Sequence, residues 1–315
     1  MRVLVAGASG ALGTRLVARL IERGHEVVGT YRSPGHGDRV GGLGAKAVQL
    51  DLLDARAVLD VVSQAQPEAI VHQATALAQA SFGRNLDRTF AETNRLRTTG
   101  TDALVAAAQT VRVPRLVAQS FAPYRYERAG TPVKTEHDAL DTHPPASARQ
   151  TFAAMDHLDE TVTRAGGIAL RYGGFYGDSD PATERGLLGP IRKRRYPIID
   201  DGAGMMCFVH LDDAATATAL AVEHGGAGIF NIVDDEPAPM REWVPFVAQL
   251  LGVKPPRHVP MWVAATIAGR EPAAMLGSCR GASNALARRE LGWELRYPSW
   301  RQGFAAAYGT GQTGS

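Results

Sequence analysis

Cysteine, excess charge of either sign and long apolar runs are all scarce in this chain of 315 residues. Two cysteines, Cys207 and Cys279, are too few for a disulfide framework, so we expect a reducing compartment. Lysine and arginine (34) nearly balance aspartate and glutamate (32), which argues against a nucleic-acid or membrane-surface partner. The longest apolar stretch, residues 259–268, is too short to span a bilayer. No charged leader precedes the first predicted strand, and we therefore expect a cytoplasmic protein.

Short apolar runs alternate with helical patterns along most of the chain. This alternation predicts an α/β protein with a parallel, doubly wound sheet, whose ligand crevice lies at the carboxyl ends of the strands. The length leaves room for a smaller second domain. The predicted strands cover residues 3–5, 27–31, 47–52, 69–74, 115–120, 167–172 and 228–233.

A glycine-rich turn joins the first predicted strand to the first predicted helix. Gly7 permits a sharp turn, Gly10 lets the backbone approach a diphosphate, and Gly13 lets the helix pack against the sheet. The N-terminus of that helix would direct free N–H groups and a partial positive charge at the phosphates. The alternative is a glycine-rich turn that holds no ligand, but the position between a strand and a helix favours a dinucleotide site.

The ends of the second and third predicted strands bear on which dinucleotide binds. The second strand ends in Tyr31 and Arg32, where a site for NAD usually has an acidic residue for the ribose hydroxyl. Arginine can instead hold a 2′-phosphate, so we predict NADP, with NAD as the alternative. The alternative that Arg32 is a solvated surface residue stays open. Asp51 ends the third strand. Its carboxylate either accepts a hydrogen bond from the adenine amino group or caps the following helix.

Four motifs together resemble the extended short-chain dehydrogenase/reductases, the NAD(P)-dependent epimerase/dehydratase group. The resemblance extends over about residues 1–305 and implies a Rossmann-type fold. The first motif is the glycine fingerprint, and the second resembles the family's Asn-x-x-Gly-Thr helix with a longer spacer. The third resembles the loop that closes over the nicotinamide, and the fourth its Phe-Val-His-x-Asp-Asp segment. They lie at residues 7–13, at Asn94 with Gly100 and Thr101, at 170–177 and at 208–214.

The resemblance implies a domain division and a coenzyme site. A dinucleotide-binding domain is expected at residues 1–177, rejoined by about 207–235, with a substrate domain at 178–206 and 236–309 and a disordered tail at 310–315. It also implies a small-molecule substrate, such as a nucleotide sugar or a small carbonyl compound, and a homodimer. The residues assigned to the coenzyme are Gly7, Ser9, Gly10, Ala11, Leu12, Gly13, Arg32, Asp51, Leu52, Gln73, Ala74, Asn94, Tyr172 and Gly174.

The family's Tyr-x-x-x-Lys pair, its proton-transfer machinery, has no counterpart here. The corresponding helix, within residues 149–160, contains neither tyrosine nor lysine. When Glu160 is aligned with a glutamate that often follows the pair, Phe152 stands at the tyrosine and Asp156 at the lysine. The family's Ser or Thr after strand five aligns without a gap with Phe121; a slip of one residue brings Ser120 there instead.

Three hypotheses follow from the missing pair. The chain is an atypical reductase, epimerase or isomerase with a substitute acid/base, and the candidates by location are Ser120, Tyr124, Tyr126 and His157. Alternatively, it is a non-redox sensor or binding subunit that only binds the dinucleotide. A third hypothesis is a non-redox lyase or cyclase that uses the same cleft. The fold does not decide among them, and no metal ligand is assigned.

Overall fold

A seven-stranded parallel sheet forms the centre of the protein, of which the computed structural model describes residues 1–79, 85–178 and 180–309. The strand order is β12-β7-β5-β4-β1-β2-β3, and every neighbouring pair is parallel. Each strand overlaps a run predicted from the sequence, so the doubly wound fold is confirmed. The strands are β1 (Arg2–Ala6), β2 (Glu26–Tyr31), β3 (Lys46–Gln49), β4 (Ala69–His72), β5 (Arg115–Phe121), β7 (Ile168–Tyr172) and β12 (Gly228–Ile232).

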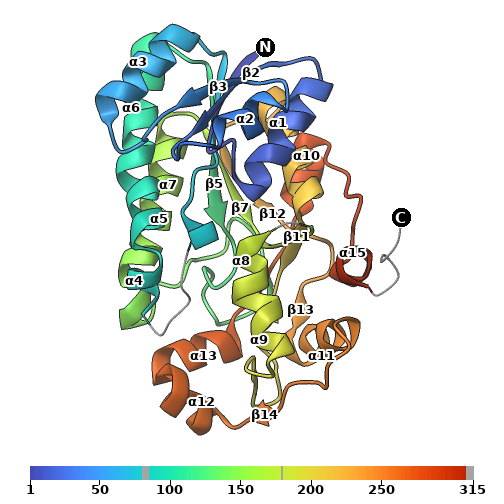
Figure 1. The fold of residues 1–315 in the computed structure, drawn as a ribbon. Coiled ribbons are helices and arrows are strands. Elements are labelled where there is room, and N and C mark those ends of the chain that lie inside the picture. The colour runs from blue at the N-terminus through green and yellow to red at the C-terminus, as the bar shows by residue number, and fades with distance from the viewer. Residues whose placement is uncertain (80–84, 179, 310–315) are drawn as a thin grey trace.

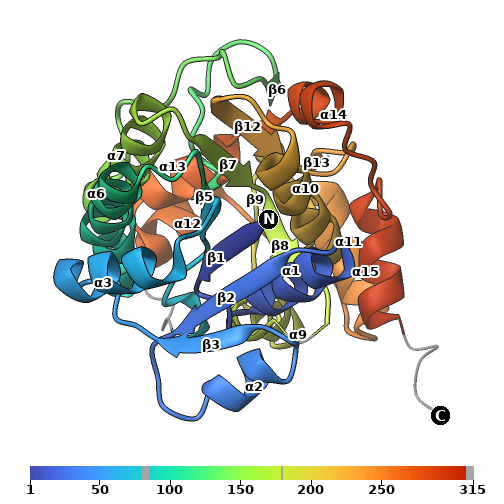
Figure 2. The ribbon, with the colours of Figure 1, turned by 90° about the horizontal axis from the view of Figure 1, so that it is seen from above.

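Helices cover both faces of the sheet (Figure 2). Alternate side chains of each strand point to opposite faces, so one face takes Leu4 and Ile70 and the other takes Val3 and Val5. The first face packs on α3 (Ala55–Ala65), α6 (Thr101–Val111) and α7 (Arg149–Arg164), and the second on α1 (Ala11–Glu22), α10 (Leu211–Glu223) and α14 (Ala285–Leu291). These two cores are buried because a parallel sheet in this fold needs cover on both sides.

Short elements gather beyond the carboxyl ends of the strands (Figure 1). Their core contains Trp243, Phe208 and Phe304, all almost fully buried. The helical elements are α8 (Pro181–Thr183), η4 (Glu184–Leu188), α9 (Gly189–Arg192), α11 (Met240–Leu250), α12 (Met261–Ala268), α13 (Arg270–Ser278) and α15 (Trp300–Tyr308). The strands are β8 (Gly174–Tyr176), β9 (Ile198–Ile199), β10 (Met205–Met206), β11 (Phe208–His210), β13 (Ala238–Pro239) and β14 (His258–Val259).

The remaining elements connect these layers. They are α2 (Gly37–Gly41), η1 (Leu77–Gln79), α4 (Leu86–Thr89), α5 (Ala91–Arg95), the π-helical η2 (Leu96–Gly100), β6 (Val133–Lys134), η3 (Ala146–Ala148) and β15 (Gly281–Ala282). The division into two domains stays a prediction, and the tail predicted at 310–315 lies outside the described residues. Within the ranges described, no helix has the length and apolar character needed to cross a membrane.

Candidate active site

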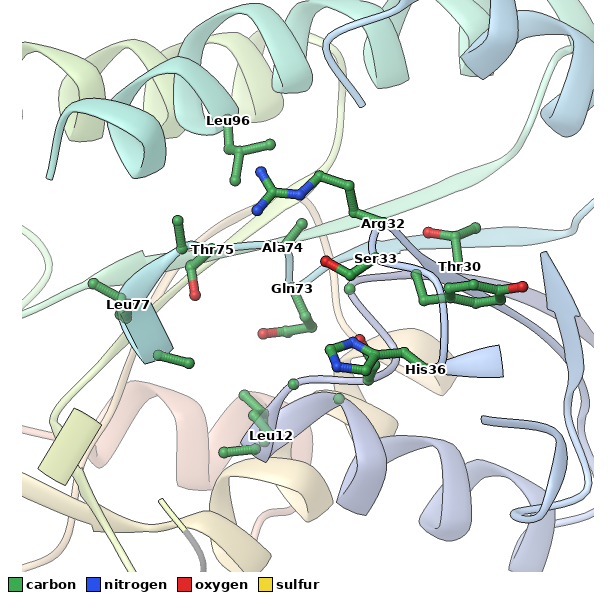
Figure 3. Close-up of a pocket in the computed structure, with 18 of the residues that line it drawn as sticks. Leu12, Thr30, Arg32, Ser33, His36, Gln73, Ala74, Thr75, Leu77 and Leu96 are labelled. Carbon is green, nitrogen blue, oxygen red and sulfur yellow. The ribbon is translucent and has the colours of Figure 1, made fainter. Parts of the chain in front are cut away.

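A crevice of about 370 Å³ opens where the strand order changes direction. The chain runs outward from β1 to β2 and β3 and then returns to β4 on the other side of β1, which is the position where doubly wound sheets bind ligands. The crevice is lined by the glycine loop, the end of β2 and the segment after β4 (Figure 3). Among its lining residues are Gly7, Ser9, Gly10, Ala11, Leu12, Gly13, Arg32, Asp51, Leu52, Gln73 and Ala74, all predicted for the coenzyme.

The glycine loop has little room for side chains. Gly7 has a φ of +87°, in the left-handed region that favours glycine, and a Cβ built there would lie 2.7 Å from the Cα of Ala74. A Cβ built on Gly13 would lie 2.1 Å from the carbonyl oxygen of Gly7. Both glycines are therefore required for the loop, the helix α1 and the segment after β4 to come this close together.

Two unsatisfied polar features in the crevice fit a nicotinamide dinucleotide. Helix α1 has no side-chain hydrogen bond at its N-cap, Gly10, and no acidic residue in its first turn, so its positive end faces the crevice uncompensated. The buried Oε1 of Gln73 has no partner among the described residues. Gln73 is oriented by donating from Nε2 to the Tyr172 hydroxyl at 3.1 Å. The helix end suits a diphosphate, and the free amide oxygen suits a donor on the ligand.

Arginine and histidine side chains line the crevice at the end of β2. Arg32 reaches into this region, and His36 and Arg39 line it from the segment that follows. Figure 3 shows the Arg32 guanidinium extending from the end of β2 toward Leu96. The nitrogen Nη1 of Arg32 forms an ion pair with Glu92 on α5. The end of β2 thus presents a guanidinium to the crevice, where an NAD site would usually present a carboxylate.

Asp51 lines the crevice beside β3 and does not cap α3. Its Oδ1 accepts a hydrogen bond from the backbone N–H of Leu53 at 3.0 Å. The cap of α3 is Asp54, whose Oδ1 accepts from two backbone N–H groups of the first helical turn. The alternative that Asp51 caps this helix is therefore wrong, because the cap residue immediately precedes the first turn.

Three residues predicted for the coenzyme lie behind the lining. Asn94 is buried and donates from Nδ2 to the Thr151 hydroxyl at 3.1 Å. Tyr172 is fully buried, and its hydroxyl contacts both Gln73 and Thr218. Gly174 lies in β8, where an added Cβ would meet the Cε of Met206 at 3.0 Å. None of the three is among the residues that line the crevice, and Tyr172 acts on the lining only through its contact with Gln73.

Helix α7, which carries the proton-transfer pair in the family, contributes here to what we call the apolar cluster. The buried members of this cluster include Phe152 and Met155 of α7 and Met275 of α13. The half-buried Phe121 and Tyr124 pack against them. Phe152 and Phe121 are the residues that the alignment puts at the family's tyrosine and Ser/Thr. Neither side chain can donate or accept a proton; the alternative alignment, with Ser120 in place of Phe121, stays a prediction.

Tyr124 is held in an unusual backbone conformation next to Phe121. Its φ is +67°, and its ring centroid lies 6.4 Å from that of Phe121. Burial raises the pKa of its phenol well above the ordinary value. A hydroxyl this hard to ionise is a poor substitute for an activated catalytic tyrosine, whose pKa must be lowered by a neighbouring cation.

Asp156, aligned with the family's lysine, pairs with a buried guanidinium. Arg125 donates from Nη2 to its Oδ1 at 2.6 Å and lies 3.3 Å from Asp159, which also pairs with Arg171 at 2.8 Å. Ser120, which the sequence predicted as a catalytic residue, is buried, and its Oγ has no partner within the described part of the chain. A network of opposite charges therefore takes the place of the lysine.

His157 lies apart from the crevice. Its Nε2 contacts Oδ1 of Asp102 at 2.7 Å, and both side chains are well exposed between α7 and α6.

The longer spacer of the Asn-to-Gly-Thr motif coincides with the π-helical stretch η2. Three residues before Gly100, where the family's spacing would put the asparagine, stands Arg97, whose burial lowers its pKa to about 10.

Several lining residues were missed from the sequence. They include Gln119 at the end of β5, Phe175 in β8 and Leu96 at the start of η2. Phe175 and Leu96 lie inside motifs that were recognised, and Gln119 lies near the end of a predicted strand, which was the available signal. Pro181 and Ala182 come from α8, far along the chain, and no local pattern marks them as crevice residues.

This chain is similar to known proteins in sequence and, for solved structures, in fold. The model of the NAD dependent epimerase/dehydratase family matches residues 3–232. A 3-diazoavenalumate denitrifying reductase from a Streptomyces species is 40% identical over 308 residues, 96% of this chain and 99% of that protein. A 2-alkyl-3-oxoalkanoate reductase from Stenotrophomonas maltophilia is 31% identical over 78% of this chain and 74% of its own length. The UDP-glucose 4-epimerase of Thermus thermophilus, solved in complex with NAD, has the same fold, with a TM-score of 0.70 at 24% identity and 98% of each chain covered.

Proposed function

Because the chain belongs to the NAD dependent epimerase/dehydratase family, we propose that it is a reductase that uses NADPH to remove a diazo group from an aromatic carboxylate. The observation that carries this proposal is the apolar cluster at α7, where the alignment puts the family's proton-transfer residues. Reduction of a carbonyl leaves an alkoxide that must receive a proton, and epimerisation of a sugar begins by removing one. Phe121 and Phe152 can do neither. An acceptor that needs no proton fits these residues better.

The charges of the proposed reaction balance without an acid. The reduced dinucleotide, when bound, supplies one hydride; a cationic diazonium group that accepts this hydride loses N2 and leaves a C–H bond. Two electrons pass to the substrate and the positive charge passes to the oxidised coenzyme. A diazonium ion bound next to the buried Phe152 and Met155 would be screened on that side from water, which would otherwise attack it. Aromatic faces such as those of Phe121 and Tyr124 also favour a planar cation.

The Streptomyces relative supports the substrate class. Its name describes a reductase that acts on a diazo carboxylate with loss of nitrogen, and its similarity extends over nearly the whole of both chains. The name of the Stenotrophomonas relative describes a reductase of an oxo acid, and that similarity covers less of this chain. A carbonyl reductase is therefore the second outcome that the experiment must distinguish.

NADPH is proposed over NADH because of the end of β2. Arg32 there offers a fork of N–H donors that suits a phosphate, and His36 and Arg39 line the same part of the crevice. The glycine loop with the end of α1 would hold the diphosphate, and Gln73 would accept from a donor of the coenzyme. We therefore propose NADP as the coenzyme, as the sequence predicts.

The test compares two acceptors of similar shape. The protein is incubated with NADPH that carries deuterium at the transferred position, together with either a carboxy-substituted benzenediazonium or a carboxy-substituted benzaldehyde. We expect one N2 and one oxidised coenzyme per diazonium consumed, with deuterium on the ring carbon, at a rate well above that without protein. Turnover of the aldehyde alone would make the protein a carbonyl reductase. Tight binding of NADPH without turnover of either would make it a binding protein, and both results would overturn the proposal.

A further inference from the structure

We propose that Glu92 determines how strongly the crevice prefers a 2′-phosphorylated dinucleotide, because it competes with that phosphate for Arg32. The inference rests on the proposed use of NADPH. Glu92 does not line the crevice itself, and it would act only through the guanidinium that does. It would therefore be a residue that determines specificity and takes no part in the chemistry.

The ion pair joins the end of β2 to α5. Arg32 follows β2, and Glu92 lies on α5, directly before the stretch that begins with the lining residue Leu96. The guanidinium extends toward Leu96 (Figure 3). Each side chain of the pair is 42% exposed, so either partner can be replaced by a ligand that enters from solvent.

The backbone of Arg32 is held while its guanidinium is free to change partners. Its carbonyl oxygen accepts a hydrogen bond from Gln49 Nε2 at 3.0 Å, which fixes the end of β2. In the described part of the chain, Glu92 is the one carboxylate that forms an ion pair with this guanidinium. Such an exposed pair contributes little to folding, so an exchange of partners leaves the fold unaffected.

A bound 2′-phosphate would bring close to two negative charges into the region that Glu92 already occupies. The guanidinium would then leave the carboxylate or be shared with it, and the carboxylate would repel the phosphate in either case. A dinucleotide without the phosphate has no such charge and does not compete. Glu92 is thus expected to weaken NADPH binding selectively, as a repulsive contact that sets a specificity ratio.

The test replaces the charge and keeps the shape. With Glu92→Gln we expect NADPH to bind about fivefold more tightly, while NADH changes by less than about twofold, both measured by titration of the purified protein. High salt should reduce the gain, because these charges are exposed. The matched control is Glu22→Gln, which removes a carboxylate from the exposed pair with Arg19 on α1 and should change neither affinity.

Two variants separate this inference from the proposed coenzyme. If Arg32→Ala weakens NADPH and NADH equally, the preference for NADPH fails. If Arg32→Ala weakens NADPH selectively while Glu92→Gln leaves NADPH unchanged, only the competition by Glu92 fails. Weaker NADPH binding in Glu92→Gln would mean that the carboxylate positions Arg32 for the phosphate, and that result would also overturn the inference.

Discussion

The two ends of the proposed site are built from different parts of the chain. The crevice end at α1 depends on backbone: Gly7 and Gly13 bring segments together, and the helix terminus offers N–H groups. The other end, the apolar cluster, depends on side chains such as Phe152 and Met155, which are not among the residues that line the crevice. The first end meets the requirements of a dinucleotide site, whereas α7 brings no tyrosine or lysine to the second. Binding and chemistry can therefore change separately on this fold.

The largest effect is expected from Phe152→Ala, which would empty the apolar cluster. Removing a buried aromatic side chain should lower the free energy of unfolding by about 3–5 kcal/mol, measured by urea denaturation. Affinity for the coenzyme in the folded variant should stay within about twofold, because Phe152 does not line the crevice. Phe152→Leu is the milder control. A loss of coenzyme affinity in both variants would show that the two ends are not independent.

His72 ends β4 and should make stability depend on pH. Its Nε2 contacts the carbonyl oxygen of Leu96 at 3.2 Å, and burial lowers its pKa to about 4. The unfolded chain binds this proton near pH 6.5, and the folded chain only near pH 4. Stability is therefore full above pH 6.5 and falls by about 3 kcal/mol as the pH drops toward 4. Denaturation curves across this range should show a weaker slope for His72→Gln, and an unchanged slope would contradict the assignment.

Gly13→Ala tests the end built from backbone. The added Cβ would lie 2.1 Å from the Gly7 carbonyl oxygen, so the loop must shift. We expect coenzyme affinity to fall by about 10- to 100-fold, a penalty typical of overpacking. The control is Gly41→Ala, since nothing lies within 4 Å of a Cβ at that glycine. Equal affinities in the two variants would argue against a coenzyme at this loop.

The smallest effect is expected from Tyr124→Phe. If the acceptor needs no proton, turnover of the diazonium should stay within about twofold, whereas loss of a general acid costs at least about 100-fold. Initial rates at saturating NADPH give the comparison. A large loss of turnover would restore Tyr124 as the acid and would remove the contrast between the two ends.

The sequence predicted the parallel sheet and the glycine loop that lines the crevice, because strand periodicity and glycine conformations are local properties. It did not predict that Tyr172 and Asn94 would lie behind the wall. A motif predicts which helix or strand lies near the ligand. It does not predict which side chains of that helix or strand line the crevice. The same gap explains why Phe175 and Leu96 were missed although their motifs were recognised.

The amino-acid sequence alone determined that a tight turn precedes α1 and that α7 carries no tyrosine or lysine, because both depend only on residue type at adjacent positions. Tertiary structure decided that Arg32 meets Glu92 and that Met275 packs with Phe152. Partners separated by 60 or more residues are chosen by how helices and strands pack, and that packing is set by the whole chain together.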